Sequence, residues 1–264
     1  MHANIFDRYH EHASLVHRLD PRSKLLVVLI FILATAFLPD GSWAAFILSW
    51  ILIAATSIAA QIGIVEITKK SVIALPFALA AITILFNQPG NPVVTFEKIA
   101  PWPLTITDAG VVRFFSILIR SWLSVQVAIL LVTTTRFPDI IHAMQHLRVP
   151  QILVSIISFM YRYMFVLVDE TMRLLRARDS RSARLPDQSG GGNISFRARV
   201  AGSMAGQLFL RSYERSDRVY NAMVARGYRG ELMTIYPHEM KRADWLLMSL
   251  AICLILVIQL TAYI

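Results

Sequence analysis

The residues of this sequence that could most obviously do chemistry are its histidines. His142 and His146 are four residues apart, a spacing that places two imidazoles on one face of a helix and suits a transition metal. His10, His12 and His17 cluster in a polar N-terminal segment. The pair lacks a nearby third ligand and the Glu of a His-Glu-x-x-His motif. We therefore expect polar or interfacial helix faces, and we predict no metal site and no cofactor.

Motifs for catalysis or nucleotide binding are absent from the sequence. Ser189 is followed by three glycines, Gly190 to Gly192, but no Lys-Ser or Lys-Thr follows them, as a phosphate-binding P-loop requires. We interpret this run as a linker. We find no Ser-His-Asp order and no paired carboxylates, so the chain is predicted not to be an enzyme. The single cysteine, Cys253, lies in an apolar run and supports no disulfide framework.

The composition indicates a membrane protein. Of all residues, 56% are hydrophobic and 16% are charged, whereas soluble domains have roughly 45–50% and 25%. The first 24 residues are polar and charged, so we expect no cleaved signal peptide.

Five apolar stretches are long enough, or nearly so, to cross the hydrocarbon core, which takes about 20 residues. They are Leu25 to Leu38, Trp43 to Ile62, Val72 to Phe86, Val111 to Val132 and Trp245 to Ile264. We therefore predict an all-α polytopic membrane protein with about five transmembrane helices. Its expected regions are a cytoplasmic N-terminal segment (1–24), four transmembrane helices (25–132), a cytoplasmic helical region (133–243) and a C-terminal transmembrane helix (244–264).

Lysine and arginine residues indicate the orientation, because basic residues near span ends stay on the cytoplasmic side. Four lie before Leu25, and seventeen lie between Thr133 and Ala243. The loop from Asn87 to Gly110 has only Lys98. The sequence therefore predicts a cytoplasmic N-terminus and a C-terminus on the opposite side.

The stretch from Ile152 to Val168 is apolar enough to be a sixth span and contains one charged residue, Arg162. A sixth crossing would place the arginine-rich stretch after it outside. We expect instead a long helix that lies along the membrane, with the crossing as the alternative.

The region from Thr133 to Ala243 holds nearly all of the chain's net charge of +9. Its seventeen basic residues face nine acidic ones, a net of +8. Such a region can face anionic lipid headgroups or an acidic protein surface. Nucleic acid is disfavoured, because the basic residues alternate with apolar ones at helical spacing and no nucleic-acid-binding motif accompanies them.

Three helices are predicted in this region, over residues 138–147, 151–181, and from 193 or 195 to 226. Pro138 and Pro150 each suit the start of a helix. Asn193 or Ser195 can cap the third helix, and Gly227 can adopt the left-handed conformation that ends it.

Small residues repeat every four positions in the third helix, at Ala198, Gly202 and Gly206. This stripe lets another helix backbone approach closely. We expect the second and third helices to cross there, which would hold their tips apart.

Arg113 and Arg120 are seven residues apart and share one face of the fourth predicted span. A charge in a span is costly unless it is paired or hydrated. Arg113 can extend to the outer interface, whereas Arg120 needs a partner such as a helix-end carbonyl or a carboxylate. A substrate path and an anchor for a partner subunit both stay open.

Three separated segments, in this order, resemble a known family. They are Leu15-Val-His-Arg-Leu-Asp-Pro-Arg-Ser-Lys24, the proline-punctuated stretch from Arg136 to Pro150, and Ala222-Met-Val-Ala-Arg-Gly-Tyr-Arg-Gly230. Together they are similar to the transmembrane coupling (T) component of energy-coupling factor (ECF) transporters, and within it to the cobalt-type CbiQ family. The likeness covers most of the chain.

The resemblance implies two Ala-Arg-Gly-like signatures, each at the C-terminal end of a long coupling helix and each engaging one ATPase subunit. Ala225-Arg226-Gly227 matches the second signature unaltered. Ser180-Arg181-Ser182 corresponds best to the first and keeps its arginine, with Ala177-Arg178-Asp179 as an alternative register.

The same resemblance implies partners and a cargo. The partners would be two ATP-binding subunits (CbiO-like), a substrate-binding membrane subunit (CbiM-like), a small accessory membrane subunit (CbiN-like) and membrane lipid, but no nucleic acid. The chain would serve, without catalysis of its own, in a bacterial inner membrane for cobalt uptake that feeds cobalamin biosynthesis. Nickel, a vitamin, or a self-sufficient carrier are the alternatives.

Overall fold

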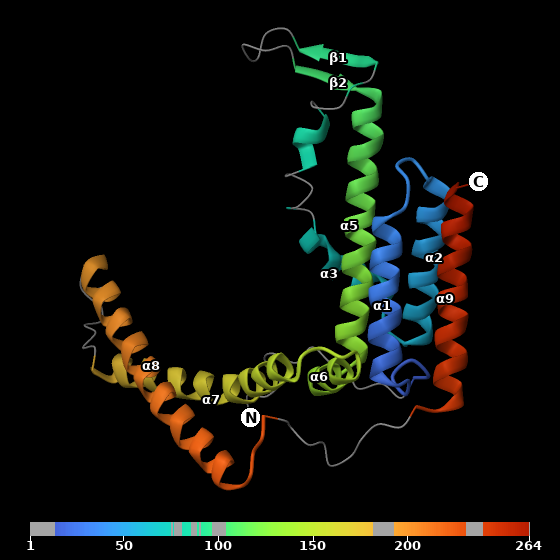
Figure 1. Ribbon diagram of the computed structural model, residues 1–264. Helices are drawn as coiled ribbons and strands as arrows, with labels where there is room; N and C mark the ends of the chain where they lie inside the picture. Colours follow the sequence, from blue (N-terminus) through green and yellow to red (C-terminus); the bar gives the residue numbers. More distant parts are fainter. Residues whose placement is uncertain are drawn as a thin grey trace. The chain divides into compact units, whose positions relative to one another are not determined.

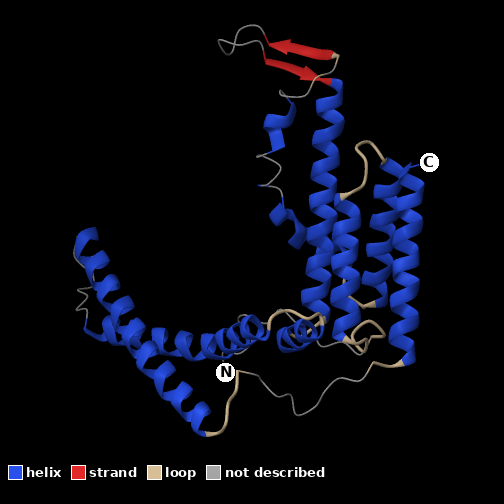
Figure 2. Cartoon of the chain, viewed as in Figure 1, coloured by secondary structure: helices blue, strands red, loops and turns tan. Residues whose placement is uncertain are grey.

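The computed structural model describes residues 14–74, 76, 81–85, 89, 91–96, 104–181, 193–230 and 240–263 (Figure 1). They divide into two compact units. The bundle unit comprises the described residues from 14 to 146 and from 240 to 263, and the two-helix unit comprises those from 147 to 230. Helices predominate in both units (Figure 2), so the predicted all-α class is confirmed.

The bundle unit is built around four neighbouring helices. Its helices are α1 (Pro21–Ala36), α2 (Trp43–Ala59), α3 (Ile64–Ser71), α5 (Asp108–Thr134), α6 (Phe137–His146) and α9 (Arg242–Tyr263). Helices α1, α2, α5 and α9 lie side by side (Figure 1) and share one hydrophobic core. The core residues are Phe31, Leu38, Ala45, Phe46, Ile53, Leu123, Val127, Ile255 and Ile258.

The outer faces of this bundle are apolar as well. Large exposed side chains on α2 and α9 include Ile47, Ile51, Leu246, Leu250, Leu256 and Leu260. An apolar surface of this extent requires an apolar medium or a partner. By length and composition, α5, α9 and α7 (Gln151–Arg181) of the two-helix unit could each cross a membrane, while α2 is apolar but shorter. The chain is therefore a membrane protein.

The third predicted span differs from the expectation. Helix α3 begins already at Ile64 and ends at Ser71, and a 3-10 turn (Val72–Ala74) follows it. Residues 81–85 are helical again, whereas 75, 77–80 and 86 lie outside the described residues. The predicted span from Val72 to Phe86 thus begins in a 3-10 turn, and the part of it outside the described residues stays a prediction.

A β-hairpin precedes α5 and was not predicted. Strands β1 (Pro92–Phe96) and β2 (Leu104–Thr107) are antiparallel. The Thr107 side chain caps α5 by accepting a hydrogen bond from the Gly110 amide at 3.2 Å. A Cβ atom at Gly110 would lie 2.8 Å from the carbonyl oxygen of Leu85, so the close approach of these two backbones requires glycine.

Arg120 of α5 has its partners within the chain. Its guanidinium donates to the Leu38 carbonyl at 2.5 Å and to the Asp40 carboxylate at 2.6 Å. Arg113 lies 3.7 Å from the same carboxylate. Asp40 belongs to the turn between α1 and α2, so these contacts attach that turn to α5. This pairing satisfies the charge, and a substrate path is not needed to explain it.

The two-helix unit consists of α7 and α8 (Ile194–Ala225). Pro150 directly precedes α7, and the Asn193 side chain caps α8 by accepting from the Ile194 amide at 2.8 Å. The predicted helices from 151 to 181 and from 193 to 226 are confirmed to within one residue at each end.

Candidate functional site

Helices α7 and α8 cross at an angle and run in opposite directions (Figure 1), which separates their C-terminal ends. Glu170 of α7 pairs with Arg211 of α8 at 2.5 Å. Ser155, near the start of α7, donates to the carbonyl of Gly230, just beyond α8, at 3.3 Å. Since later residues of α8 meet earlier residues of α7, the two C-termini lie at opposite ends of the pair (Figure 1).

The helix ends extend well past the Glu170–Arg211 pair. At 1.5 Å per residue, Arg181 lies about 16 Å beyond Glu170 along α7, and Ala225 lies about 21 Å beyond Arg211 along α8. Both arginine positions therefore lie several turns beyond the Glu170–Arg211 pair along their own helices.

The C-terminus of α8 has the hydrogen bonds of a Schellman motif. The Gly227 amide donates to the Val224 carbonyl at 2.9 Å, and the Tyr228 amide donates to the Met223 carbonyl at 3.0 Å. Gly227 has φ +83°, and a Cβ atom there would have nothing within 4 Å. Glycine is thus needed for the left-handed backbone conformation and not for space. The motif leaves Arg226 exposed at the tip.

The C-terminus of α7 also presents an arginine. Ser180 and Arg181 are exposed, whereas Ser182 lies outside the described residues. In the alternative register, Arg178 lies 3.4 Å from the Asp179 carboxylate. The side chains of Arg181 and Arg226 form no hydrogen bond and no ion pair with any described residue. Arg178 therefore has a neighbouring carboxylate, which the Arg181 side chain lacks among the described residues.

The small-residue stripe is not where the two helices meet. Ala198, Gly202 and Gly206 are exposed, and a Cβ atom at either glycine would have nothing within 4 Å. The helices instead contact through large side chains and the Glu170–Arg211 pair. The predicted crossing at Gly202 and Gly206 is therefore wrong, because long side chains and not a close backbone approach join these helices.

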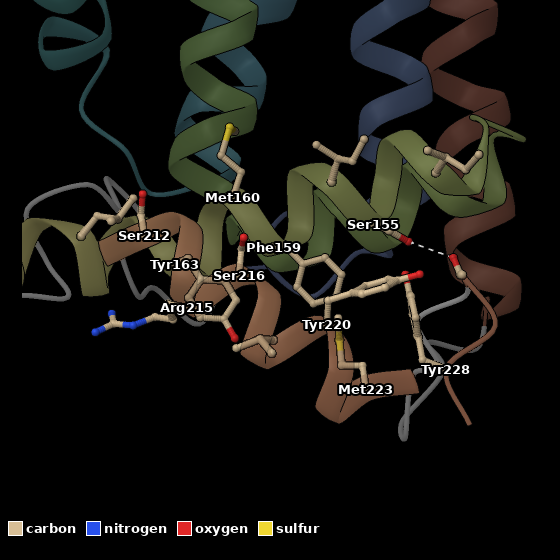
Figure 3. A pocket seen from close by; sticks show the side chains of 15 residues that line it. Ser155, Phe159, Met160, Tyr163, Ser212, Arg215, Ser216, Tyr220, Met223 and Tyr228 are labelled. Atoms are coloured by element: carbon tan, nitrogen blue, oxygen red, sulfur yellow. Dashed lines mark hydrogen bonds between the residues drawn. The ribbon is translucent and has the colours of Figure 1, made fainter. Parts of the chain in front are cut away.

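Aromatic residues that the sequence did not single out hold the α8 end against α7. The Tyr228 ring packs edge-on against Phe159, with ring centroids 6.4 Å apart. Met223 lines the same space (Figure 3). Tyr228 directly follows the capping glycine, a position that commonly contacts the last helical turn. That rule could have indicated Tyr228 and Met223, whereas nothing local in the sequence indicates Phe159.

The N-terminal segment that carries the resemblance forms a buried polar anchor in the bundle unit. Asp20 caps α1, its side chain accepting from the Arg22 amide at 2.9 Å, with Pro21 as the first helical residue. The Asp244 carboxylate at the start of α9 accepts from the Asp20 amide at 3.1 Å and from the Lys241 amide at 2.9 Å. This segment therefore fixes the start of α1 to the start of α9.

Lys24 joins the same anchor just before the apolar stretch of α1. Its ammonium donates to the carbonyls of His17 at 3.1 Å and Thr134 at 3.2 Å. Burial lowers the pKa of Lys24 from 10.5 to about 8, and the carboxylates of Asp139, Asp20 and Asp244 partly oppose this change. The lysine thus links the N-terminal segment to the end of α5 at the expense of its hydration.

The histidine pair on α6 forms no metal site with other described residues. His142 and His146 have ring centroids 4.9 Å apart, and His146 lies within hydrogen-bond distance of the His142 carbonyl. In the part of the chain that the structure describes, no group of three or more His, Cys, Asp or Glu side chains could hold a metal ion.

The fold and the site together define a class: a polytopic α-helical membrane protein with a pair of long helices that end in exposed arginines. The profile of the CbiQ family, described as cobalt transport protein, matches residues 12–236. The chain belongs to the CbiQ family.

Relatives match over nearly the whole chain. An ECF transporter transmembrane protein, EcfT, of Lactobacillus helveticus is 28% identical over 261 residues, which cover 96% of this chain and 91% of the relative. EcfT of Streptococcus thermophilus is 28% identical over 236 residues, covering 86% and 85%. An uncharacterised protein of Methanocaldococcus jannaschii is 27% identical over 259 residues, covering 96% and 85%. The resemblance expected from the three segments is confirmed.

Proposed function

We propose that this chain is the coupling (T) subunit of an ECF transporter and transmits ATP-driven motion of two ATP-binding subunits to a separate substrate-binding membrane subunit. The observation that carries the proposal is that an exposed arginine stands at the C-terminal end of each of the helices α7 and α8. These two C-termini lie at opposite ends of the helix pair. The relatives named as transmembrane proteins of ECF transporters support it.

The chemistry of the two tips suits such a role. A guanidinium is permanently charged and offers a rigid fork of donors that matches a carboxylate in a partner's groove. Each arginine ends a helix about 45 to 50 Å long. The Glu170–Arg211 pair and the Tyr228–Phe159 contact join the two helices, so a displacement at one tip is passed to the other helix.

We propose cobalt ion as the cargo, on the description of the family. The chain itself would not recognise it; that task would belong to a CbiM-like subunit, assisted by a CbiN-like one, while CbiO-like subunits bind ATP. The distribution of basic residues supports a cytoplasmic N-terminus and a cytoplasmic two-helix unit in a bacterial inner membrane.

Alanine substitutions at the tips test this function. Removing one partner of a buried charged hydrogen bond costs on the order of 2–5 kcal/mol. Arg181→Ala and Arg226→Ala should each impair cobalt uptake, and the double variant should lose copurifying ATP-binding subunits. Arg218→Ala, which removes an exposed arginine about two turns before the end of α8, is the matched control. Full uptake and a full complement of ATP-binding subunits in the double variant would refute the proposal.

A further inference from the structure

An apolar cavity of about 540 Å³ lies between α7 and α8. Its walls combine aliphatic, methionine and aromatic side chains from both helices. Figure 3 shows Phe159 of α7 facing Tyr220 of α8. The apolar residues of its lining include Ile156, Phe159, Met160, Leu167, Val219 and Met223. A cavity of this size and lining is typical of a site for an apolar ligand.

The lining of the cavity is long enough for one lipid tail. Its lining residues on α7 run from Ile152 to Leu167, about 22 Å along the helix. An acyl chain spans one leaflet, about 15 Å, half of the hydrocarbon core. The surrounding surface is also suited to lipid, since Ile152 is 71% exposed and Met160 is 60% exposed, and α7 is apolar enough to lie in a membrane.

One end of the cavity carries a positive charge. Arg215 of α8 lines it, and Figure 3 shows its guanidinium pointing away from the apolar side chains. One turn earlier, Arg211 is neutralised by Glu170. Arg215 has no such partner among the described residues, so it can bind an anion at the mouth of the cavity.

From this combination we infer that the cavity binds an anionic phospholipid, with one acyl chain between α7 and α8 and the phosphate on Arg215. The charge selects the occupant, because an apolar segment of a protein would have no group for Arg215, whereas a phospholipid has both an apolar tail and an anionic phosphate. The bound lipid would fill the space that separates the two helices along their apolar stretch.

Lipid retention tests the inference. The full chain is purified with its copurifying subunits and reconstituted into vesicles that contain equal amounts of phosphatidylglycerol and phosphatidylcholine. After extraction in detergent, the lipids that stay bound are identified by native mass spectrometry. The wild type should retain about one phosphatidylglycerol per chain. Arg215→Gln should abolish the preference for phosphatidylglycerol over phosphatidylcholine, and Ser216→Phe, which fills the cavity from an exposed position, should abolish retention of both. Arg218→Gln, an exposed arginine that does not line the cavity, should behave as the wild type.

Two outcomes would overturn the inference. One is an equal phosphatidylglycerol preference in the wild type and in Arg215→Gln. The other is a wild-type chain that retains no lipid while Ser216→Phe releases a copurifying subunit, which would make the cavity a protein-docking site. Neither outcome bears on the arginine tips, so the proposed coupling function stands or falls separately.

Discussion

The capping glycine of α8 offers a sharp test of how the Arg226 tip is built. Gly227 has φ +83° and open space around its Cα atom. An alanine there meets no clash but must adopt a left-handed backbone, which costs roughly 1–2 kcal/mol. Gly202 has the same open space but lies inside α8, where alanine is favoured over glycine by roughly 0.5–1 kcal/mol. The same chemical change should therefore destabilise at one position and stabilise at the other.

Two assays follow from this pair of variants. Gly227→Ala should lower the free energy of unfolding in mixed micelles by about 1–2 kcal/mol, while Gly202→Ala should leave it unchanged or raise it. Hydrogen exchange should speed up in Gly227→Ala over the amides of residues 227 and 228, which donate to the Val224 and Met223 carbonyls. Equal stability and equal exchange in the two variants would refute the reasoning that backbone conformation sets this tip.

Three further predictions concern the bundle unit. Gly110→Ala should destabilise it by roughly 1–3 kcal/mol, measured by unfolding in mixed micelles, because the new methyl group would meet the Leu85 carbonyl at 2.8 Å. Arg120→Met should lower the free energy of unfolding by about 1–3 kcal/mol in the same assay and loosen the α1–α2 turn, because Asp40 loses its closest cation. An unchanged free energy of unfolding would mean that the ion pair contributes nothing to stability. Because the pKa of Lys24 is lowered in the folded chain, the unfolded chain binds more protons than the folded one between about pH 8 and 10.5. The free energy of unfolding should therefore rise with pH across that window. Lys24→Met should remove the rise.

Much of the two-helix unit follows from local sequence signals. Pro150 and Asn193 marked the starts of α7 and α8, and Gly227 marked the end of α8, because caps and prolines act within one turn of the helix. The arginine tips at the two helix ends were predicted from the same signals together with the family resemblance.

The contacts between segments could not be predicted in the same way. Gly202 and Gly206 suggested a crossing by their spacing, but spacing fixes only which face a residue shares and not what that face meets. The Glu170–Arg211 pair that joins the helices spans 41 positions in the sequence. Likewise, the need of Arg120 for a partner was evident, but Asp40 was identified only by the packing of α5 against the α1–α2 turn.

Site-specific crosslinking from the two tips tests the coupling account most directly. A photoreactive amino acid is placed at position 181, at position 226, or at the control position 218, about two turns before the end of α8, in the complex purified from native membranes. The account predicts that positions 181 and 226 each crosslink to an ATP-binding subunit, that a chain carrying both captures two copies, and that position 218 captures none. Crosslinks from 181 and 226 that reach lipid or the substrate-binding subunit, with no ATP-binding subunit among the products, would contradict it.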